Sequence, residues 1–179
     1  MVLGWCFQTP LETAGLIRNI PGPVSHIWKS AEKRRSILEW GLNWAWNTQE
    51  ASVVLCDMKN IQEVKENTGY AQEAKADSIS IREEILISKV RDTYQDLRPI
   101  QCTACRCCMP CPVSLDVPRI FEIYNDAVIY SDTAMGKYLY RHERHDIGTC
   151  TGCGHCVSAC PKEIPIDHWL ETASKLIGN

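Results

Sequence analysis

The chain carries the stretch CTACRCCMPCP at residues 102–112 and the related stretch CTGCGHCVSACP at residues 150–161. Each stretch holds three cysteines in the spacing C-x₂-C-x₂-C, and then a fourth cysteine that is followed directly by proline. This pattern is typical of ferredoxins with two [4Fe–4S] clusters, in which the fourth cysteine of one motif ligates the other cluster. The doubled motif therefore predicts two [4Fe–4S] clusters whose ligands cross between the stretches.

The crossed pattern gives each cluster three cysteines from one stretch and one from the other. The first cluster is expected on Cys102, Cys105, Cys108 and Cys160. The second cluster is expected on Cys150, Cys153, Cys156 and Cys111. Cys107 is left over, and as the neighbour of Cys108 it should point away from the cluster. The first stretch departs from the bacterial pattern because it has two residues, not three, before its fourth cysteine.

A pair of structural zinc sites is the alternative, because C-x₂-C knuckles also build Cys₄ zinc sites. Zinc ribbons pair two knuckles and do not require a proline after the cysteine, whereas each stretch here packs three cysteines into seven residues. The pattern favours iron–sulfur clusters. Their expected role is the transfer of electrons, and a structural or metal-sensing role is the alternative.

The overall composition excludes several classes of partner. A formal net charge of −3 gives no basic field, so we expect neither nucleic acid nor an anionic membrane as a partner. No apolar run approaches the roughly 20 residues that span a bilayer. The first residues, MVLGWCFQTPLE, lack a basic n-region, so we expect no signal peptide. A cytoplasmic location, in which the thiols stay reduced, is the natural expectation.

The distribution of the eleven cysteines divides the chain. Only Cys6 and Cys56 precede the first stretch, and both lie in apolar runs that favour burial. We expect one domain at residues 1–98 and a second at residues 99–179, separated at the helix stop before Pro99. Apolar patterns predict strands at residues 2–7 and 51–56. They predict helices at residues 30–47, 60–76, 79–97, 117–129 and 167–177.

The cysteine stretches, with the sequences that follow them, resemble a known family. CTACRCCMPCPVSLDVPRIFEIYNDAVIYSD and CTGCGHCVSACPKEIPI are similar to the C-terminal ferredoxin extension of the aldo/keto reductase-like iron–sulfur proteins. Upstream, ILEWGLNWAWN and VVLCDMKNIQEVKENTGYA resemble the last two βα units of the barrel of that family. The resemblance implies an α/β partial TIM-barrel segment followed by a small, α-rich, ferredoxin-like domain with two [4Fe–4S] clusters.

The same resemblance bears on catalysis and on nucleotide binding. The catalytic Asp, Tyr, Lys and His of the family lie on early barrel strands that this chain does not contain, so no catalytic residue is assigned here. The family's NADP contacts imply a pyrophosphate loop at residues 10–15. They also imply adenosine contacts from Lys59, Asn60, Glu66 and Asn67. Asp57 places a negative charge beside this region, which disfavours phosphate, and a barrel remnant without nucleotide is the alternative.

Two predicted strands make too small a sheet to cover the apolar helix faces around Trp40, Trp44 and Ile85. We therefore expect a partner protein that completes the sheet or barrel and exchanges electrons with this chain. The predicted function is the relay of single electrons through the two clusters. The competing hypothesis is a subunit of an oxidoreductase whose catalytic barrel lies on another chain.

Overall fold

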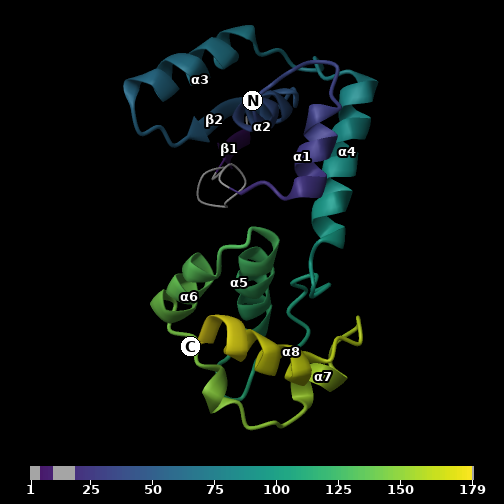
Figure 1. Cartoon of the computed structure of the whole chain (residues 1–179), viewed down its shortest axis with the longest axis vertical. Coiled ribbons are helices and arrows are strands. Elements are labelled where there is room, and N and C mark those ends of the chain that lie inside the picture. The colour runs from purple at the N-terminus through teal and green to yellow at the C-terminus, as the bar shows by residue number, and fades with distance from the viewer. Residues whose placement is uncertain (1–4, 10–18, 179) are drawn as a thin grey trace. The chain divides into compact units, whose positions relative to one another are not determined.

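The computed structural model describes residues 5–9 and 19–178, and the side chains of residues 19–178 (Figure 1). The described part of the chain is mostly helical and divides into two compact units, Met1–Thr93 and Tyr94–Asn179. The division lies near the end of helix α4 (Ile81–Asp96), which ends close to the helix stop predicted before Pro99. Each unit is described by itself below.

The first unit contains a two-stranded parallel sheet within the described residues. Strand β1 (Trp5–Thr9) pairs with strand β2 (Ala51–Cys56) from Trp5↔Ala51 to Thr9↔Cys56, with one irregularity after Trp5. A parallel pair needs a crossover connection, and the crossover here includes helices. The structure describes the strand predicted at residues 2–7 from Trp5 onward and extends it to Thr9, and residues 2–4 lie outside the described part. The helices of this unit are α1 (Gly22–Lys29), α2 (Ile37–Trp46), α3 (Ile61–Glu73) and α4.

The helix predicted at residues 30–47 is wrong in its first part. Ser36 caps α2, because its Oγ accepts a hydrogen bond of 3.0 Å from the backbone N–H of Glu39. Ser30 instead ends helix α1, which the sequence analysis missed. Proline residues flank Gly22 at the start of that helix, and proline is tolerated in the first turn because those N–H groups have no partner inside the helix.

Helix α2 packs its apolar side on the rest of the first unit. Trp40 is buried and stacks on Trp28 at 5.2 Å between ring centroids, while Trp44 is 56% exposed. The guanidinium of Arg35 lies 4.6 Å from the centroid of the Trp40 ring and donates to Glu83 of α4 at 2.5 Å. This cation–π and ion-pair contact joins α2 to α4 within the unit. Trp40 is therefore part of the core of the first unit, and Trp44 is not.

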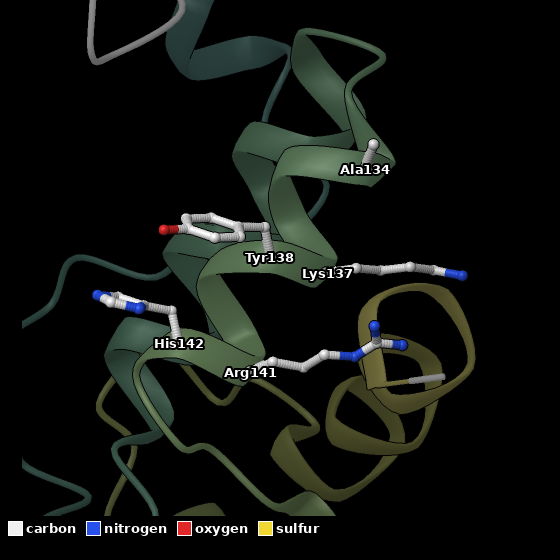
Figure 2. A pocket seen from close by; sticks show the side chains of 5 residues that line it. All are labelled: Ala134, Lys137, Tyr138, Arg141 and His142. Carbon is white, nitrogen blue, oxygen red and sulfur yellow. The ribbon is translucent and has the colours of Figure 1, made fainter.

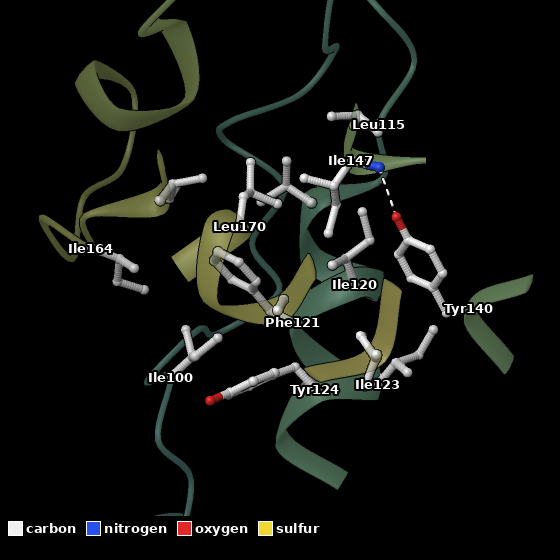
Figure 3. Packing of buried hydrophobic residues seen from close by; sticks show 14 of the residues in the cluster. Ile100, Leu115, Ile120, Phe121, Ile123, Tyr124, Tyr140, Ile147, Ile164 and Leu170 are labelled. Carbon is white, nitrogen blue, oxygen red and sulfur yellow. Dashed lines mark hydrogen bonds between the residues drawn. The ribbon is translucent and has the colours of Figure 1, made fainter. Parts of the chain in front are cut away.

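The second unit is helical around a continuous apolar core (Figure 3). Helix α5 (Val117–Ile129) matches its predicted bounds, and its Ile120 and Phe121 are almost fully buried. The helix predicted at residues 167–177 is an α-helix to Ala173 and then a π-helical turn. The remaining elements are α6 (Thr133–His142), η1 (Ile147–Thr149), α7 (His155–Ser158), α8 (Ile166–Ala173) and η2 (Ser174–Gly178).

Helix α6 was missed by the sequence analysis, and its packing explains why. The buried residues of α6 are Gly136 and Tyr140, so its apolar stripe is too narrow to give a clear helical pattern. A Cβ atom at Gly136 would lie 2.8 Å from the Cβ of Ala127 and 3.0 Å from Ile177 Cγ2. The absence of a side chain lets α6 approach α5 and η2 closely. The burial of α6 depends on Gly136, and a pattern of hydrophobic residues does not reveal the role of a glycine.

Candidate metal centre

The two cysteine loops of the second unit have positive φ angles at equivalent positions. In the first loop the residues on either side of Cys105 have positive φ, 53° at Ala104 and 62° at Arg106. In the second loop the equivalent residues are Gly152 and Gly154, with φ of 66° and 72°. The left-handed region is open to glycine and is unfavourable for other L-residues. The shared conformation therefore comes from two different sets of residues.

The ends of the two loops also match. Ser114 lies three residues after Cys111 and has φ of 60°, and Glu163 lies three residues after Cys160 and has φ of 52°. Their backbone N–H groups donate to the carbonyls of Cys111 at 2.9 Å and Cys160 at 3.1 Å. Helices α5 and α8 begin directly after these turns. The cysteine loop, the turn and the helix thus form a structural repeat within the second unit.

Each loop is anchored to the core just before its first cysteine. The buried side chain of Asn125 accepts from the N–H of Ile100 at 3.0 Å and donates to the carbonyl of Ile100 at 2.9 Å. Before the second loop, the hydroxyl of Tyr140 accepts from the N–H of Ile147 at 2.7 Å (Figure 3). Buried backbone groups need such partners, so these contacts fix where each loop starts.

Two cavities lie between the loops and the starts of helices α5 and α8. The first cavity, of about 20 Å³, contains in its lining the whole first predicted ligand set, Cys102, Cys105, Cys108 and Cys160. The second cavity, of about 130 Å³, contains the whole second set, Cys111, Cys150, Cys153 and Cys156. Cys108 also lines the second cavity, whereas Cys107 is exposed and lines neither cavity. The structure thus brings each predicted set together crosswise.

The donor set of these cavities is soft and the remaining lining is largely apolar. Phe121 and Ile166 line the first cavity, and Leu115 and Leu170 line the second. Thiolates in an apolar surround suit iron–sulfur clusters and also suit zinc. Among residues 5–9 and 19–178, no three Cys, His, Asp or Glu side chains form a group that could hold a single metal ion. At least four thiols line each cavity, and four cysteine thiolates are the donor set of a [4Fe–4S] cluster.

The thiols influence one another electrostatically. Hydrogen bonds from the backbone N–H and then the side chain of Cys107 lower the pKa of Cys105. Burial raises the pKa of Cys108, and the sulfurs of Cys102 and Cys156 add to this effect. Burial likewise raises the pKa of Cys156. Gathering several thiolates in one place is therefore unfavourable unless positive metal atoms offset their charge.

An ion-pair network supports the segment that leads to the second loop. Arg119 of α5 donates to both carboxylate oxygens of Glu143, at 2.9 Å from Nε and 2.6 Å from Nη2. His145 Nε2 lies 3.0 Å from Oε2 of the same carboxylate. The hydrogen bonds from Arg119 lower the pKa of Glu143 to about 2. Glu143 follows helix α6, so the network joins α5 to the chain between α6 and Cys150.

The residues implied in nucleotide binding have local structural partners. Asn60 caps α3, because its Oδ1 accepts from the N–H of Glu63 at 3.0 Å, and Glu63 in turn accepts from the N–H of Lys59 at 2.6 Å. Glu66 accepts from Gln62 at 2.7 Å. Asn67 is buried and its Nδ2 lies 3.5 Å from Cys56 Sγ. The loop at residues 10–15 lies outside the described residues.

The surfaces of the two units differ in character. A shallow hollow on helix α6 of the second unit is lined by Lys137, Tyr138, Arg141 and His142, together with Ala134 (Figure 2). The rings of Tyr138 and His142 stack at 5.4 Å, so this surface is basic and aromatic. In the first unit, by contrast, many large apolar side chains are exposed. They include Trp44, Val53, Leu55, Met58, Ile61, Val64, Ile81 and Ile85.

Comparison with known proteins agrees with this geometry. The family model of the 4Fe–4S dicluster domain matches residues 99–164. The chain contains a ferredoxin-like 4Fe–4S dicluster domain. The prediction of an iron–sulfur domain in the second part of the chain is thereby confirmed. In the described residues, no helix is both long and apolar enough to cross a membrane.

Curated relatives with significant similarity are large subunits of one kind of complex. The acetyl-CoA decarbonylase/synthase complex subunit alpha 1 of Methanosarcina mazei is 33% identical over 78 residues, which cover 43% of this chain and 8% of the relative. The subunit of the same name from Methanosarcina barkeri is 34% identical over 77 residues, 42% of this chain and 8% of the relative. No solved structure matches the chain. These matches do not show the resemblance to aldo/keto reductases, and a two-stranded sheet does not show a barrel segment.

Proposed function

We propose that this protein relays single electrons through two [4Fe–4S] clusters. The observation that carries the proposal is the crosswise assembly of two cysteine sets around two adjacent cavities. The ligands of one cluster would be Cys102, Cys105, Cys108 and Cys160. Those of the other would be Cys111, Cys150, Cys153 and Cys156. The dicluster-domain match over residues 99–164 supports the same assignment of the domain.

The residues around the cavities have roles that suit electron relay. When bound, such clusters supply reversible one-electron chemistry. The apolar side chains at the starts of α5 and α8 limit the access of water to the thiolates. Cys108 and Val117 line both cavities, so the two sites adjoin and electrons have a short route between them. Cys105, Cys150 and Cys153 are exposed, which leaves an edge of each site open to a partner.

Iron and acid-labile sulfide analysis of protein prepared without oxygen tests the proposal. We expect about eight iron and eight sulfide per chain, the content of two four-iron clusters. Replacing Cys108 by Ser should remove at least one cluster, because this thiol is buried in the first cavity. The matched variant Cys107→Ser should keep the full content, since this exposed neighbour lines neither cavity. Zinc without sulfide, or iron loss in Cys107→Ser with tolerance of Cys108→Ser, would contradict the assignment.

We also propose a protein partner that covers the first unit. Val53 and Leu55 of strand β2 are about half exposed, and Ile61 of α3 is 70% exposed. Apolar surface of this extent usually marks an interface. The relatives of the dicluster region are subunits named for a multi-subunit complex, which supports a role within a larger assembly. Size-exclusion chromatography with light scattering tests this proposal. A stable monomer, found both for the purified chain alone and for the chain in the presence of co-purified proteins, would argue against such a partner.

A second candidate function is that of an oxidoreductase subunit whose catalytic barrel lies on another chain. The parallel pairing of β1 and β2 around a helical crossover is compatible with a barrel segment. The isolated chain should then show no carbonyl reduction with NADPH, and activity should appear only with the partner. Nucleotide contacts from Lys59, Asn60, Glu66 and Asn67 belong to this candidate. Their present hydrogen bonds within α3 and to Cys56 do not favour it.

A further inference from the structure

The two cysteine-lined cavities differ in the charge of their linings. Arg106 and Lys162 line the first cavity, which has no acidic residue among its lining side chains. Asp167 and His155 line the second cavity, which has no lysine or arginine among its lining side chains. The first site is therefore more positive than the second.

The two sites share part of their lining and part of their loop geometry, and they differ in charge. Val117 lines both cavities, as does the partly shared Cys108, and each cavity contacts the starts of both α5 and α8. The loops have the same pattern of positive φ angles. Because the thiol of Cys108 lines both cavities, its burial affects both sites.

The two cations of the first site are not equivalent. Arg106 donates to Asp116 at 3.0 Å, so the carboxylate offsets part of its charge. Lys162 has no ion pair within the described residues and lies two positions after Cys160. In the second site, Asp167 lies in the first turn of α8 and likewise makes no ion pair within the described part of the chain. Lys162 and Asp167 therefore carry most of the uncompensated charge.

We infer, on the basis of the proposed function, that Lys162 raises the reduction potential of the first cluster and that Asp167 lowers the potential of the second. Reduction adds one electron to a centre that four thiolates already make anionic. A nearby ammonium group stabilises the added charge, and a nearby carboxylate opposes it. When both clusters are bound, Lys162 would favour an added electron on the first cluster and Asp167 would disfavour it on the second. Transfer of an electron from the second cluster to the first would break no bond and move no proton.

Potentiometric titration followed by EPR, on the full chain with its clusters, tests the inference. We expect two resolved reduction steps in the unmodified protein. Lys162→Gln should shift the higher step downward and leave the lower step in place, and Lys162→Arg should restore the original value. Asp167→Asn should shift only the lower step upward. Lys175→Gln is the control, because Lys175 pairs with Glu171 at 2.7 Å and lines neither cavity.

The outcomes separate this inference from the proposed function. A single unresolved step, equal shifts of both steps, or a Lys162→Gln shift confined to the lower step would overturn the inference while two clusters remain present. A protein without EPR-active iron would instead contradict the proposed function itself. Iron content measured on each variant distinguishes a change of potential from the loss of a cluster.

Discussion

The two cysteine loops share left-handed backbone positions, but different residue types occupy these positions. The second loop has Gly152 and Gly154 at its left-handed positions, so its local sequence favours the observed shape. The first loop has Ala104 and Arg106 there, and each disfavours the left-handed region by about 1 kcal/mol or more. The first loop is also the one that Asn125 holds with two buried hydrogen bonds, whereas Tyr140 provides one for the second. Tertiary anchoring thus offsets unfavourable local conformation in the first loop.

The largest expected effect comes from removing the anchor of the first loop. Asn125→Ala leaves the buried N–H and C=O of Ile100 without partners, and each such group costs about 1–3 kcal/mol. We expect the free energy of unfolding to fall by about 2–4 kcal/mol. The cluster that contains Cys102 should be lost first, because Ile100 precedes that cysteine by two residues. Chemical denaturation and the rate of iron release measure these effects.

Two variants provide comparisons for the Asn125 result. Tyr140→Phe removes one hydrogen bond to the second loop and should reduce stability by about 1–2 kcal/mol. Thr172→Ala removes an exposed hydroxyl that bonds within α8 and should leave stability nearly unchanged. If Tyr140→Phe reduced stability more than Asn125→Ala, the first loop would not depend on its anchor more than the second loop depends on its own, and our interpretation would be wrong.

A smaller, pH-dependent effect is expected at the segment before the second loop. Glu143 has its pKa lowered to about 2 by Arg119, so its stabilising effect is complete above the ordinary carboxyl pKa of 4.5 and is lost as the pH falls towards 2. Because both side chains are partly exposed, we expect a contribution of about 1–2 kcal/mol. Glu143→Gln should therefore be less stable than the unmodified protein at pH 7, and the difference should shrink below pH 4.5.

The comparison between variants at each pH removes the acid sensitivity that both proteins share through their cysteine thiolates. Unfolding by denaturant at several pH values gives the difference. A difference that stays constant from pH 7 to the acid end of the range would show that Glu143 acts through packing and not through its charge.

Most of what could be predicted about the site came from the pattern of cysteines in the sequence. The spacing predicted two crossed sets of four cysteines, and each set lies in the lining of one cavity, with Cys108 in both linings. The left-handed conformation of Ala104 and Arg106 could not be predicted, since nothing in those residue types favours it. The anchoring role of Asn125 could not be predicted, because Asn125 binds only backbone groups of Ile100. Helix α6 was missed because burial at Gly136 depends on close approach and not on apolar side chains.

The smallest expected effect tests the local backbone preferences of the two loops. At Gly152 an added Cβ would meet no atom within 4 Å, so Gly152→Ala changes the backbone preference without a steric clash. The left-handed penalty of about 1–2 kcal/mol, reduced by the lower entropy of alanine in the unfolded chain, predicts a loss of about 1 kcal/mol. The reciprocal change, Ala104→Gly in the first loop, should be neutral or slightly stabilising for the same reason. Denaturation midpoints measured side by side give both values. A destabilising Ala104→Gly variant would mean that the packing of the Ala104 methyl group outweighs its backbone strain. The two loops would then differ less in local backbone strain than their sequences suggest.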